Sequence, residues 1–408
     1  MVNWGVALLK RKAQTLKEAM RNLDPVHSLE VSELDRYFVE REQTPIFEMA
    51  ISLEDAEQQK FLFTGHRGNG KSTELAKLEA HLQDRFFVVR YALRNVLDLY
   101  DIGYVDVLLS TAIQIIEKVQ AENVELAKTT RDLLELCWSF GREIEKEIEH
   151  GNARKGEAEA SIGDIFVRLK SRISSEASTR DVVRKKVTPD ISKLFEGIDV
   201  LAQDVKQKTG KPLLCIVEDL DKIDPEKAEE IFYKNAKTIS DPTPAIIYTF
   251  PVALHHSNEY TQIEQFFDYS YTLPNFKAEN RDKIANILLQ RLEEQLISEE
   301  ALNLLIDYSG GVPRNVIRLA KAACTKARVA TATQITAEHV QDAINKERNE
   351  FDRMLTQAQR EDLKKVVETQ SIDQTEGYRD LLHNLSVLEY ENGSLWYDVN
   401  PVVRDLLE

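Results

Sequence analysis

The residues from Gly65 to Thr73 have the spacing of a phosphate-binding loop, in the run Gly65-His66-Arg67-Gly68-Asn69-Gly70-Lys71-Ser72-Thr73. Glycines let such a loop turn tightly enough for several backbone N–H groups to point at one anionic group. We expect Lys71 to reach the β- and γ-phosphates of a nucleoside triphosphate and the Ser72 hydroxyl to ligate Mg²⁺. The nine residues of the run are the predicted nucleotide-binding residues. The alternative, a glycine-rich surface turn, is disfavoured by the strand and helix that flank the run.

A group of carboxylates follows a second apolar run. Leu213 to Val217 is followed directly by Glu218, Asp219 and, after a leucine, Asp221. In a phosphate-loop fold we expect this strand to lie beside the first one, with its end next to the γ-phosphate. One carboxylate would hold a metal-bound water and another would orient or deprotonate the attacking water. Glu218 and Asp219 fit these roles in either order and, with Ser72, form the predicted metal site, whereas Asp221 is expected to cap or brace the loop.

Strands and helices must position these groups. The apolar residues Phe61 to Phe63 predict a buried strand before the loop, and Leu75, Leu78 and Leu82 predict a helix after it. Further strands are predicted at 85–93, 245–251 and 269–276, and the continuous apolar run within 85–93 suits a parallel strand buried on both faces. The pattern therefore predicts an α/β fold with a parallel sheet of the phosphate-loop type.

The residues from about 101 to 210 predict a helical insertion between two strands, with a loop at 151–163, where no apolar stripe is present. Within it, seven basic residues face only Glu176 and Asp181: Arg168, Lys170, Arg172, Arg180, Arg184, Lys185 and Lys186. A solvated helix face is the favoured interpretation. The alternatives are a DNA contact through 168–186 or a cation donated to the nucleotide of a neighbouring subunit.

The C-terminal third predicts two further parts. Residues 277–352 are helical throughout, and Gly310-Gly311-Val312-Pro313 ends one helix and begins the next, which places Arg314 in a first helical turn. Residues 353–408 predict two helices and a hairpin around Asn392-Gly393, the order of a winged helix. Residues 355–408 contain five basic and eleven acidic side chains. Because a DNA-binding domain is expected to be basic, we favour a contact of this domain with a protein over binding to DNA. The predicted domains are thus a core over 1–276, a helical lid over 277–352 and a winged helix over 353–408.

Composition and charge indicate which partners and which cellular compartment suit the protein. The formal net charge of −16 over 408 residues argues against non-specific coating of nucleic acid. The cysteines Cys137, Cys215 and Cys324 are far apart, as expected for buried thiols in a reducing compartment. The N-terminus lacks the order of a secretory signal, and no apolar run approaches the roughly 18 to 20 residues that span a bilayer. We expect a cytoplasmic protein without membrane contact.

With the phosphate loop, the Glu218-Asp219 strand and the Gly310 to Arg314 turn in this order, the chain resembles the AAA+/STAND group of ATPases over roughly residues 30 to 408. The likeness is to bacterial relatives of origin-recognition-like and KAP-type NTPases. The resemblance implies ATP and Mg²⁺ as cofactors, hydrolysis to ADP and phosphate, Thr249 as a first sensor of the γ-phosphate and Arg314 as a second. It also makes Tyr37, Phe38 and Pro45 candidates for contacts to the adenine base, although core packing is the favoured interpretation for each of them.

Two departures from the family pattern affect the expected rate. The usual order of the carboxylates is Asp then Glu, whereas this chain has Glu218 then Asp219. The family's trans-acting arginine is also missing, because no Arg or Lys stands between Pro251 and the strand at 269. Such an arginine contributes about 10³–10⁵ in rate, so we expect either slow hydrolysis or a finger supplied by the basic stretch.

The leading functional hypothesis is an ATP-dependent molecular switch that controls a protein partner or an assembly, including a homo-oligomer. The resemblance adds a role in bacterial defence or signalling. The alternatives are a DNA-bound ATP-dependent loader or transposition-type regulator, and a scaffold that binds ATP without hydrolysing it.

Overall fold

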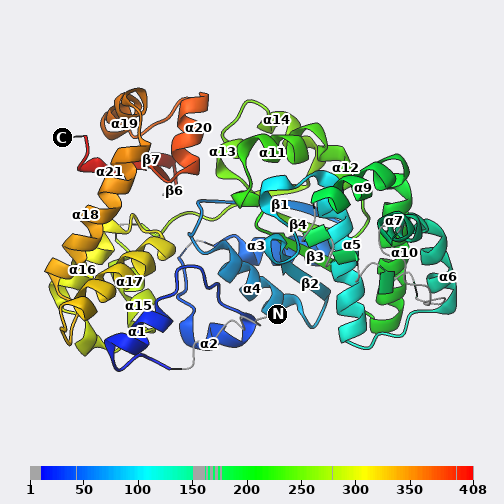
Figure 1. Ribbon diagram of the computed structural model, residues 1–408, viewed down its shortest axis with the longest axis horizontal. Coiled ribbons are helices and arrows are strands. Elements are labelled where there is room, and N and C mark those ends of the chain that lie inside the picture. Colours follow the sequence, from blue (N-terminus) through cyan, green and yellow to red (C-terminus); the bar gives the residue numbers. More distant parts are fainter. Residues whose placement is uncertain are drawn as a thin grey trace.

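A five-stranded parallel sheet stands at the centre of the molecule (Figure 1). The structure, a computed structural model, describes residues 11–149, 161, 164–165, 169–170, 173–174 and 177–407, except 43, 278 and 392. The strands have the order β2-β3-β4-β1-β5 and are β1 (Lys60–Thr64), β2 (Phe87–Ala92), β3 (Leu213–Glu218), β4 (Ala245–Phe250) and β5 (Tyr269–Thr272). The prediction that β3 lies beside β1 is wrong, because β4 pairs with both and separates them. All strands are parallel, so the end of β3 still lies at the same edge as the phosphate loop.

The two faces of the sheet are buried by different helices. On one face, Phe61 and Phe63 of β1 pack with α3 (Ile46–Asp55) and α4 (Lys71–Leu82). On the other face, Leu62 lies in the core formed with the insertion helices and with the short helices α11 (Pro225–Glu229), η6 (Glu230–Lys234) and α12 (Ala236–Ser240). Successive strand residues point to opposite faces, so a strand covered on both sides is apolar at every position. The predicted parallel sheet is confirmed; β1 to β4 are largely buried, whereas Tyr269 and Ser270 of the edge strand β5 are exposed.

The helical insertion follows β2 and lies at the right of Figure 1. Its helices are α5 (Tyr104–Ala121), α6 (Lys128–Cys137), α7 (Phe140–Glu149), α9 (Ala177–Val187) and α10 (Ile191–Thr209). The predicted loop at 151–163 lies outside the described residues apart from Ser161, and so do Arg168 and Arg172. After β4 the chain forms α13 (Val252–His255) and α14 (Tyr260–Ile263) before it enters β5.

A second core contains the helices after β5 together with the N-terminal helix. It joins α1 (Leu16–Asn22) to α15 (Arg281–Leu289), α16 (Glu299–Tyr308), α17 (Pro313–Val329) and α18 (Ala337–Met354). The Cys324 thiol lies 3.3 Å from the carbonyl oxygen of Leu16, and the backbone N–H of Ala13 donates to the carbonyl of Arg291 at 2.9 Å. The described N-terminal residues from Ala13 to Leu23 therefore pack with the helices after β5. The chain then passes through η1 (Val31–Glu33) and α2 (Leu34–Tyr37) to the core.

The C-terminal residues form two helices and an antiparallel hairpin, in the order the sequence predicts. These elements are α19 (Gln357–Thr369), α20 (Glu376–His383), β6 (Val387–Glu391) and β7 (Leu395–Val399), and the short helix α21 (Pro401–Arg404) follows them. They share a core that also includes Val252 of α13 and Phe351 of α18. Cys137, Cys215 and Cys324 are buried free thiols, as predicted. Within the described residues, every helix is too short or too polar to cross a membrane.

Candidate functional site

The phosphate loop connects β1 to α4 and takes a conformation that requires its glycines. Gly65, Gly68 and Gly70 have φ values of +137°, +88° and +106°, which side chains rarely adopt. A Cβ atom at Gly65 would lie 2.6 Å from the carbonyl oxygen of Leu273. The Asn69 side-chain amide donates to the same carbonyl at 2.6 Å, which ties the loop to the end of β5. The loop is therefore held in shape by neighbouring strands.

Lys71 lies buried inside this loop. Its ammonium group donates to the carbonyls of Gly65 at 2.7 Å and His66 at 2.9 Å, and it forms an ion pair with Asp221 at 2.9 Å. Although burial opposes ionisation of Asp221, the charges of Lys71 and Lys222 lower the pKa of that carboxyl to about 2. Asp221 thus braces the loop through Lys71, the role that the sequence indicates for it.

Glu218 and Asp219 occupy different surroundings at the end of β3. Burial raises the pKa of Glu218, against the effect of Arg90 at 2.8 Å and of a hydrogen bond with Ser72. Asp219 has a φ of +78°, which costs a residue with a side chain on the order of 1–3 kcal/mol. Its carboxylate pairs with Lys222 and with the Nε atom of Arg94 at 3.3 Å. Glu218 is therefore the carboxylate beside the loop serine, and Asp219 points toward two cations.

Arg90 was not predicted as a site residue. From β2 it contacts Glu218, Glu79 at 2.5 Å and Glu30 at 2.6 Å. Although burial opposes it, these carboxylates raise the pKa of Arg90. The network holds the Glu218 carboxylate in place.

Arg314 lies in the first turn of α17 and Thr249 near the end of β4, as the sequence predicts. The backbone N–H of Arg314 donates to the carbonyl of Gly68 at 3.0 Å, and its Nε donates to the carbonyl of Pro25 at 3.1 Å. Thr249, at the end of β4, is buried and hydrogen-bonds Asp221. The first turn of α17 therefore rests directly on the phosphate loop.

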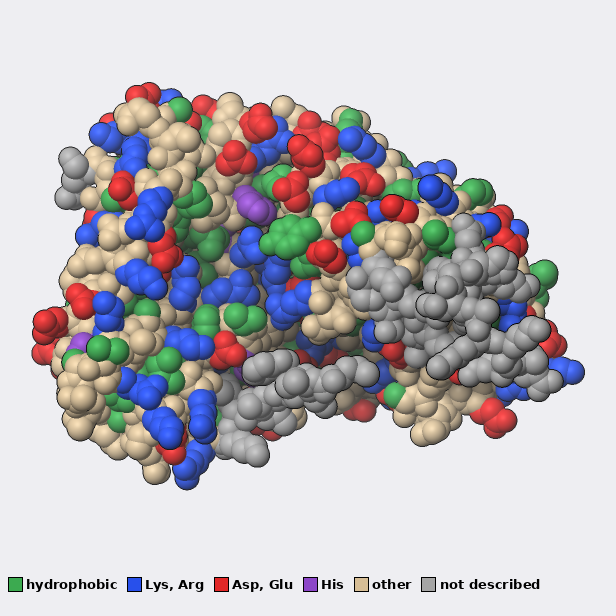
Figure 2. Space-filling model, in the orientation of Figure 1, with side chains coloured by type: hydrophobic (Ala, Val, Ile, Leu, Met, Phe, Trp, Pro, Cys, Tyr) green, Lys and Arg blue, Asp and Glu red, His purple; other side chains and the backbone are tan. Residues whose placement is uncertain are grey.

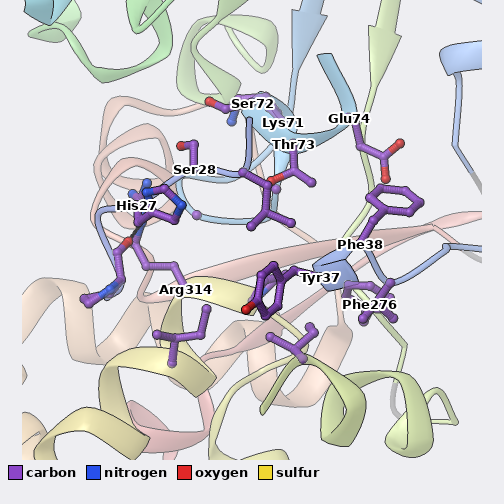
Figure 3. A pocket seen from close by; sticks show the side chains of 18 of the residues that line it. His27, Ser28, Tyr37, Phe38, Lys71, Ser72, Thr73, Glu74, Phe276 and Arg314 are labelled. Atoms are coloured by element: carbon purple, nitrogen blue, oxygen red, sulfur yellow. Dashed lines mark hydrogen bonds between the residues drawn. The ribbon is translucent and has the colours of Figure 1, made fainter. Parts of the chain in front are cut away.

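A pocket of about 810 Å³, open space at its mouth included, lies between the loop, α17 and the N-terminal segment. Figure 3 shows Lys71 and Ser72 at one end and the rings of Tyr37, Phe38 and Phe276 gathered at another. The buried Tyr37 hydroxyl has no hydrogen-bond partner among the described residues. The site thus combines a polar phosphate end with an aromatic end. Pro45 does not line this pocket; it stands directly before α3.

Arg41 also lines the pocket, and the sequence carries no signal for it. Its guanidinium donates to the carbonyls of Pro274 at 2.7 Å and of Asn69, lies 4.0 Å from the Phe276 ring centre and pairs with Glu74. Burial lowers its pKa to about 10. One residue of the N-terminal segment thereby joins the loop to the segment that leads into the lid.

The C-terminal hairpin reaches the phosphate loop through His66. The backbone N–H of Glu389 in β6 donates to His66 Nε2 at 2.7 Å, and the Glu389 carboxylate pairs with His256, just after α13. The Asn275 amide donates to the Glu389 carbonyl at 3.0 Å, and the Tyr390 hydroxyl donates to the Gly310 carbonyl at 2.8 Å. A strand more than 300 residues away therefore contacts the loop, the end of β5 and the lid together.

Positive charge gathers around the pocket. Figure 2 shows Lys and Arg side chains collected in the hollow at the middle of the molecule. Burial lowers the pKa of Arg314, and the nearby charges of Arg67 and Arg94 lower it further, whereas Asp221 and Asp219 oppose this shift. Cations that repel one another in a partly buried site are stabilised by an anionic ligand. The arrangement fits a polyphosphate.

The oxygen atoms that a magnesium ion requires are present at the same place. Ser72 hydrogen-bonds Glu218, and the buried Oδ2 of Asp219 accepts no hydrogen bond from the described residues. Hydroxyl and carboxylate oxygens are the ligands that Mg²⁺ prefers, together with phosphate oxygens and water. Ser72 and Glu218 therefore lie together as the predicted metal site requires, whereas Asp219 is turned toward Lys222 and Arg94.

The fold and the site define an α/β phosphate-loop protein with a helical insertion and helical segments after the sheet, the predicted fold class. No family model and no curated protein matches the chain. Among solved structures it is similar to a Walker-type ATPase of Pyrococcus abyssi, with 13% identity, a TM-score of 0.46 and coverage of 95% of this chain and 99% of that one. Cdc6p from Pyrobaculum aerophilum has 13% identity, a TM-score of 0.41 and coverage of 95% of each chain. The ORC1 protein of Aeropyrum pernix, in complex with DNA, has 12% identity, a TM-score of 0.40 and coverage of 97% and 96%.

Proposed function

We propose that the protein is an AAA+/STAND-type ATPase that binds ATP with Mg²⁺, hydrolyses it slowly and works as a molecular switch. The switch would change how the lid and the C-terminal hairpin are held, and so control a protein partner or an assembly. A place in bacterial defence or signalling rests on the sequence resemblance alone.

One observation carries the proposal: the same loop contacts the lid and the hairpin. Gly68 accepts a hydrogen bond from Arg314 of α17 at 3.0 Å, and His66 accepts one from Glu389 of β6 at 2.7 Å. A ligand that moves the loop by a fraction of an ångström must lengthen or shorten both contacts. Nucleotide state can therefore bias the position of both parts, as a two-state switch requires.

The chain's own residues have separate tasks in this proposal. A triphosphate would draw Lys71 away from Asp221, while the loop N–H groups bind phosphate oxygens. Tyr37, Phe38 and Phe276 would hold the base. Mg²⁺, held by Ser72 and the carboxylates, would supply positive charge to the phosphates. Asp219 would orient the attacking water.

Hydrogen exchange of the whole protein, without nucleotide, with ADP and with ATP, tests the switch. We expect ATP to change protection in α17 and β6 relative to ADP, and Lys71→Ala to abolish the difference together with ATP binding. A Lys118→Ala variant, on the insertion surface, is the control and should respond like the wild type. Identical protection in all nucleotide states, or an intact response in Lys71→Ala, would refute the switch.

The scaffold alternative is separated by phosphate release. We expect slow release from the wild type and a loss of at least tenfold in Asp219→Asn, since one catalytic proton acceptor contributes about 10²–10⁴ in rate. Binding of ATP without any release would support the scaffold instead.

The DNA alternative loses support from the basic stretch. Lys170 pairs with Glu117 at 2.7 Å, Arg180 with Asp101 at 3.0 Å, and Arg184 with Asp101 and with Asp106 at 2.6 Å. These cations hold the insertion helices together, so they are engaged before any phosphate arrives. We expect no duplex binding at low salt with ATP present; affinity that falls steeply with salt would favour the DNA reading.

A further inference from the structure

Three described cations of the basic stretch are poor replacements for the trans-acting arginine of the usual ATPase design. Lys170, Arg180 and Arg184 are occupied by carboxylates of α5 and of the segment before it. Their ion pairs lie within the insertion, and releasing Arg184 to a neighbouring subunit would leave the fully buried carboxylate of Asp106 unpaired. These three cations are therefore disfavoured as donors to a γ-phosphate.

Arg94 stands at the edge of the sheet where the catalytic carboxylates lie. It belongs to η2 (Leu93–Asn95), two residues beyond Ala92, which is the partner of Glu218 in the β2–β3 register. Parallel pairing carries the chain after β2 past the end of β3, so Arg94 meets Asp219. Its position follows from backbone pairing and does not depend on a flexible loop.

Arg94 and Asp219 form a long ion pair between a partly exposed arginine and a buried carboxylate. The Nε atom of Arg94 lies 3.3 Å from Oδ2 of Asp219, an oxygen that accepts no hydrogen bond from the described residues. Asp219 is buried, whereas the Arg94 side chain is 35% exposed. Lys222 also pairs with Asp219, so the carboxylate keeps a counter-ion when Arg94 moves. Arg94 is thus free to exchange one anionic partner for another.

We propose that Arg94 supplies, from within the same chain, the arginine that stabilises the γ-phosphoryl group during hydrolysis. This inference rests on the proposed ATPase function. Arg94 lies within electrostatic reach of Arg314, which lines the pocket beside Lys71. A planar guanidinium that donates two parallel hydrogen bonds suits the equatorial oxygens of a transferring phosphoryl group. No neighbouring subunit is needed to complete such a site.

Movement of the Arg94 side chain from Asp219 to the γ-phosphate would both stabilise the phosphoryl group and free the carboxylate to accept a proton. When the γ-phosphate takes Arg94 from Asp219, the carboxylate is released toward the attacking water. The water oxygen then forms a bond to the γ-phosphorus while the bond from that phosphorus to the β,γ-bridging oxygen breaks, and its electron pair leaves with ADP. One water proton passes to Asp219 and then to solvent, and inorganic phosphate is the second product.

If the arginine comes from the same chain, the rate of hydrolysis should not depend on protein concentration. The rate per molecule does not depend on assembly, so specific activity is constant over a wide range of protein concentrations. A cis arginine is also compatible with slow turnover, since regulatory GTPases with an arginine in cis work at about 10⁻² s⁻¹. The inference therefore agrees with a switch that hydrolyses slowly.

The test compares the wild type with Arg94→Ala, Arg94→Lys and the control Arg85→Ala. Arg85 precedes the same strand and pairs with Glu54 at the surface, at the end of β2 away from the carboxylates. Three quantities are measured for each protein: affinity for a fluorescent ATP analogue, phosphate release at 10 nM to 10 µM protein, on the order of a thousandfold range, and retention of ADP in the presence of aluminium fluoride.

We expect ATP affinity within about threefold of the wild type in every variant. Phosphate release should fall by about 10²-fold or more in Arg94→Ala and by at least tenfold in Arg94→Lys, because an ammonium cannot reproduce the fork. Retention of ADP with aluminium fluoride, which mimics the transferring phosphoryl group, should be lost in both and kept in Arg85→Ala. Wild-type specific activity should not change with protein concentration.

Two results would overturn the assignment of Arg94: phosphate release and ADP retention in Arg94→Ala like those of the wild type, or a wild-type rate per molecule that rises with concentration. A wild type that fails to bind the ATP analogue would instead refute the proposed function. The two failures are therefore distinguishable.

Discussion

Replacing Lys71 is expected to destabilise the protein even when no nucleotide is present. The ammonium group and the Asp221 carboxylate lie 2.9 Å apart, with only 5% and 4% of their side chains exposed. Removing one partner of a buried ion pair leaves an uncompensated charge, which costs about 3–5 kcal/mol. The free energy of unfolding of Lys71→Met should therefore fall by about that amount at pH 7.

The pH dependence of this loss has a definite sign. In the wild type the pKa of Asp221 is lowered to about 2, below the value of about 3.9 in an unfolded chain, so its stabilising effect is complete above pH 4 and is lost as the pH falls toward 2. Without Lys71, burial raises the pKa of the Asp221 carboxyl. Protonation of this carboxyl at lower pH therefore stabilises the folded variant. The difference between wild type and variant should thus be largest near neutral pH and should shrink toward pH 4.

The assay is urea unfolding of four proteins without nucleotide: wild type, Lys71→Met, Asp221→Asn and the double variant. The double variant should recover at least 1–2 kcal/mol relative to the sum of the single losses, as expected for partners in contact. Lys118→Met is the control, since Lys118 and Glu122 form an exposed pair at 2.7 Å that contributes at most about 1 kcal/mol. If Lys71→Met loses no more stability than Lys118→Met, the buried pair does not stabilise the loop and the reasoning fails.

Two further predictions concern the contacts of the loop with other elements. Gly68→Ala and Gly210→Ala both place a side chain at positive φ, which costs about 1–2 kcal/mol. Only at Gly68 would the new Cβ meet another residue, the Cβ of Arg314 at 2.5 Å, so hydrogen exchange should show faster exchange in α17 for Gly68→Ala than for Gly210→Ala. Burial lowers the pKa of His66 to about 4, below the ordinary 6.5, so the folded state loses up to roughly 3 kcal/mol as the pH falls from 6.5 to 4. Urea unfolding over this range should depend less on pH in His66→Gln; equal pH dependence would show that His66 is not held neutral by its contact with Glu389.

The local sequence pattern was sufficient to predict those parts of the site that are formed by residues close together in the sequence. The turn from Gly65 to Gly70 needs positive φ angles, the helix after it begins at Lys71, and Glu218 ends an apolar strand. Each of these features depends on residues a few positions away, so the printed sequence predicts them. The hairpin after α20 was predicted for the same reason, from a turn between two apolar runs.

Only the tertiary structure decided which distant residues meet at the loop. An apolar run shows that a strand is buried but not which strand is its neighbour, so the place of β4 between β3 and β1 was missed. Arg41 reaches Pro274, 233 positions away, and Glu389 reaches His66, 323 positions away. Arg94 meets Asp219 because β2 pairs with β3. The sequence by itself determined a phosphate loop with carboxylates at the end of a strand. The packing of the sheet, lid and hairpin decided which charges surround them, because electrostatic contacts depend on distance in space and not on separation along the chain.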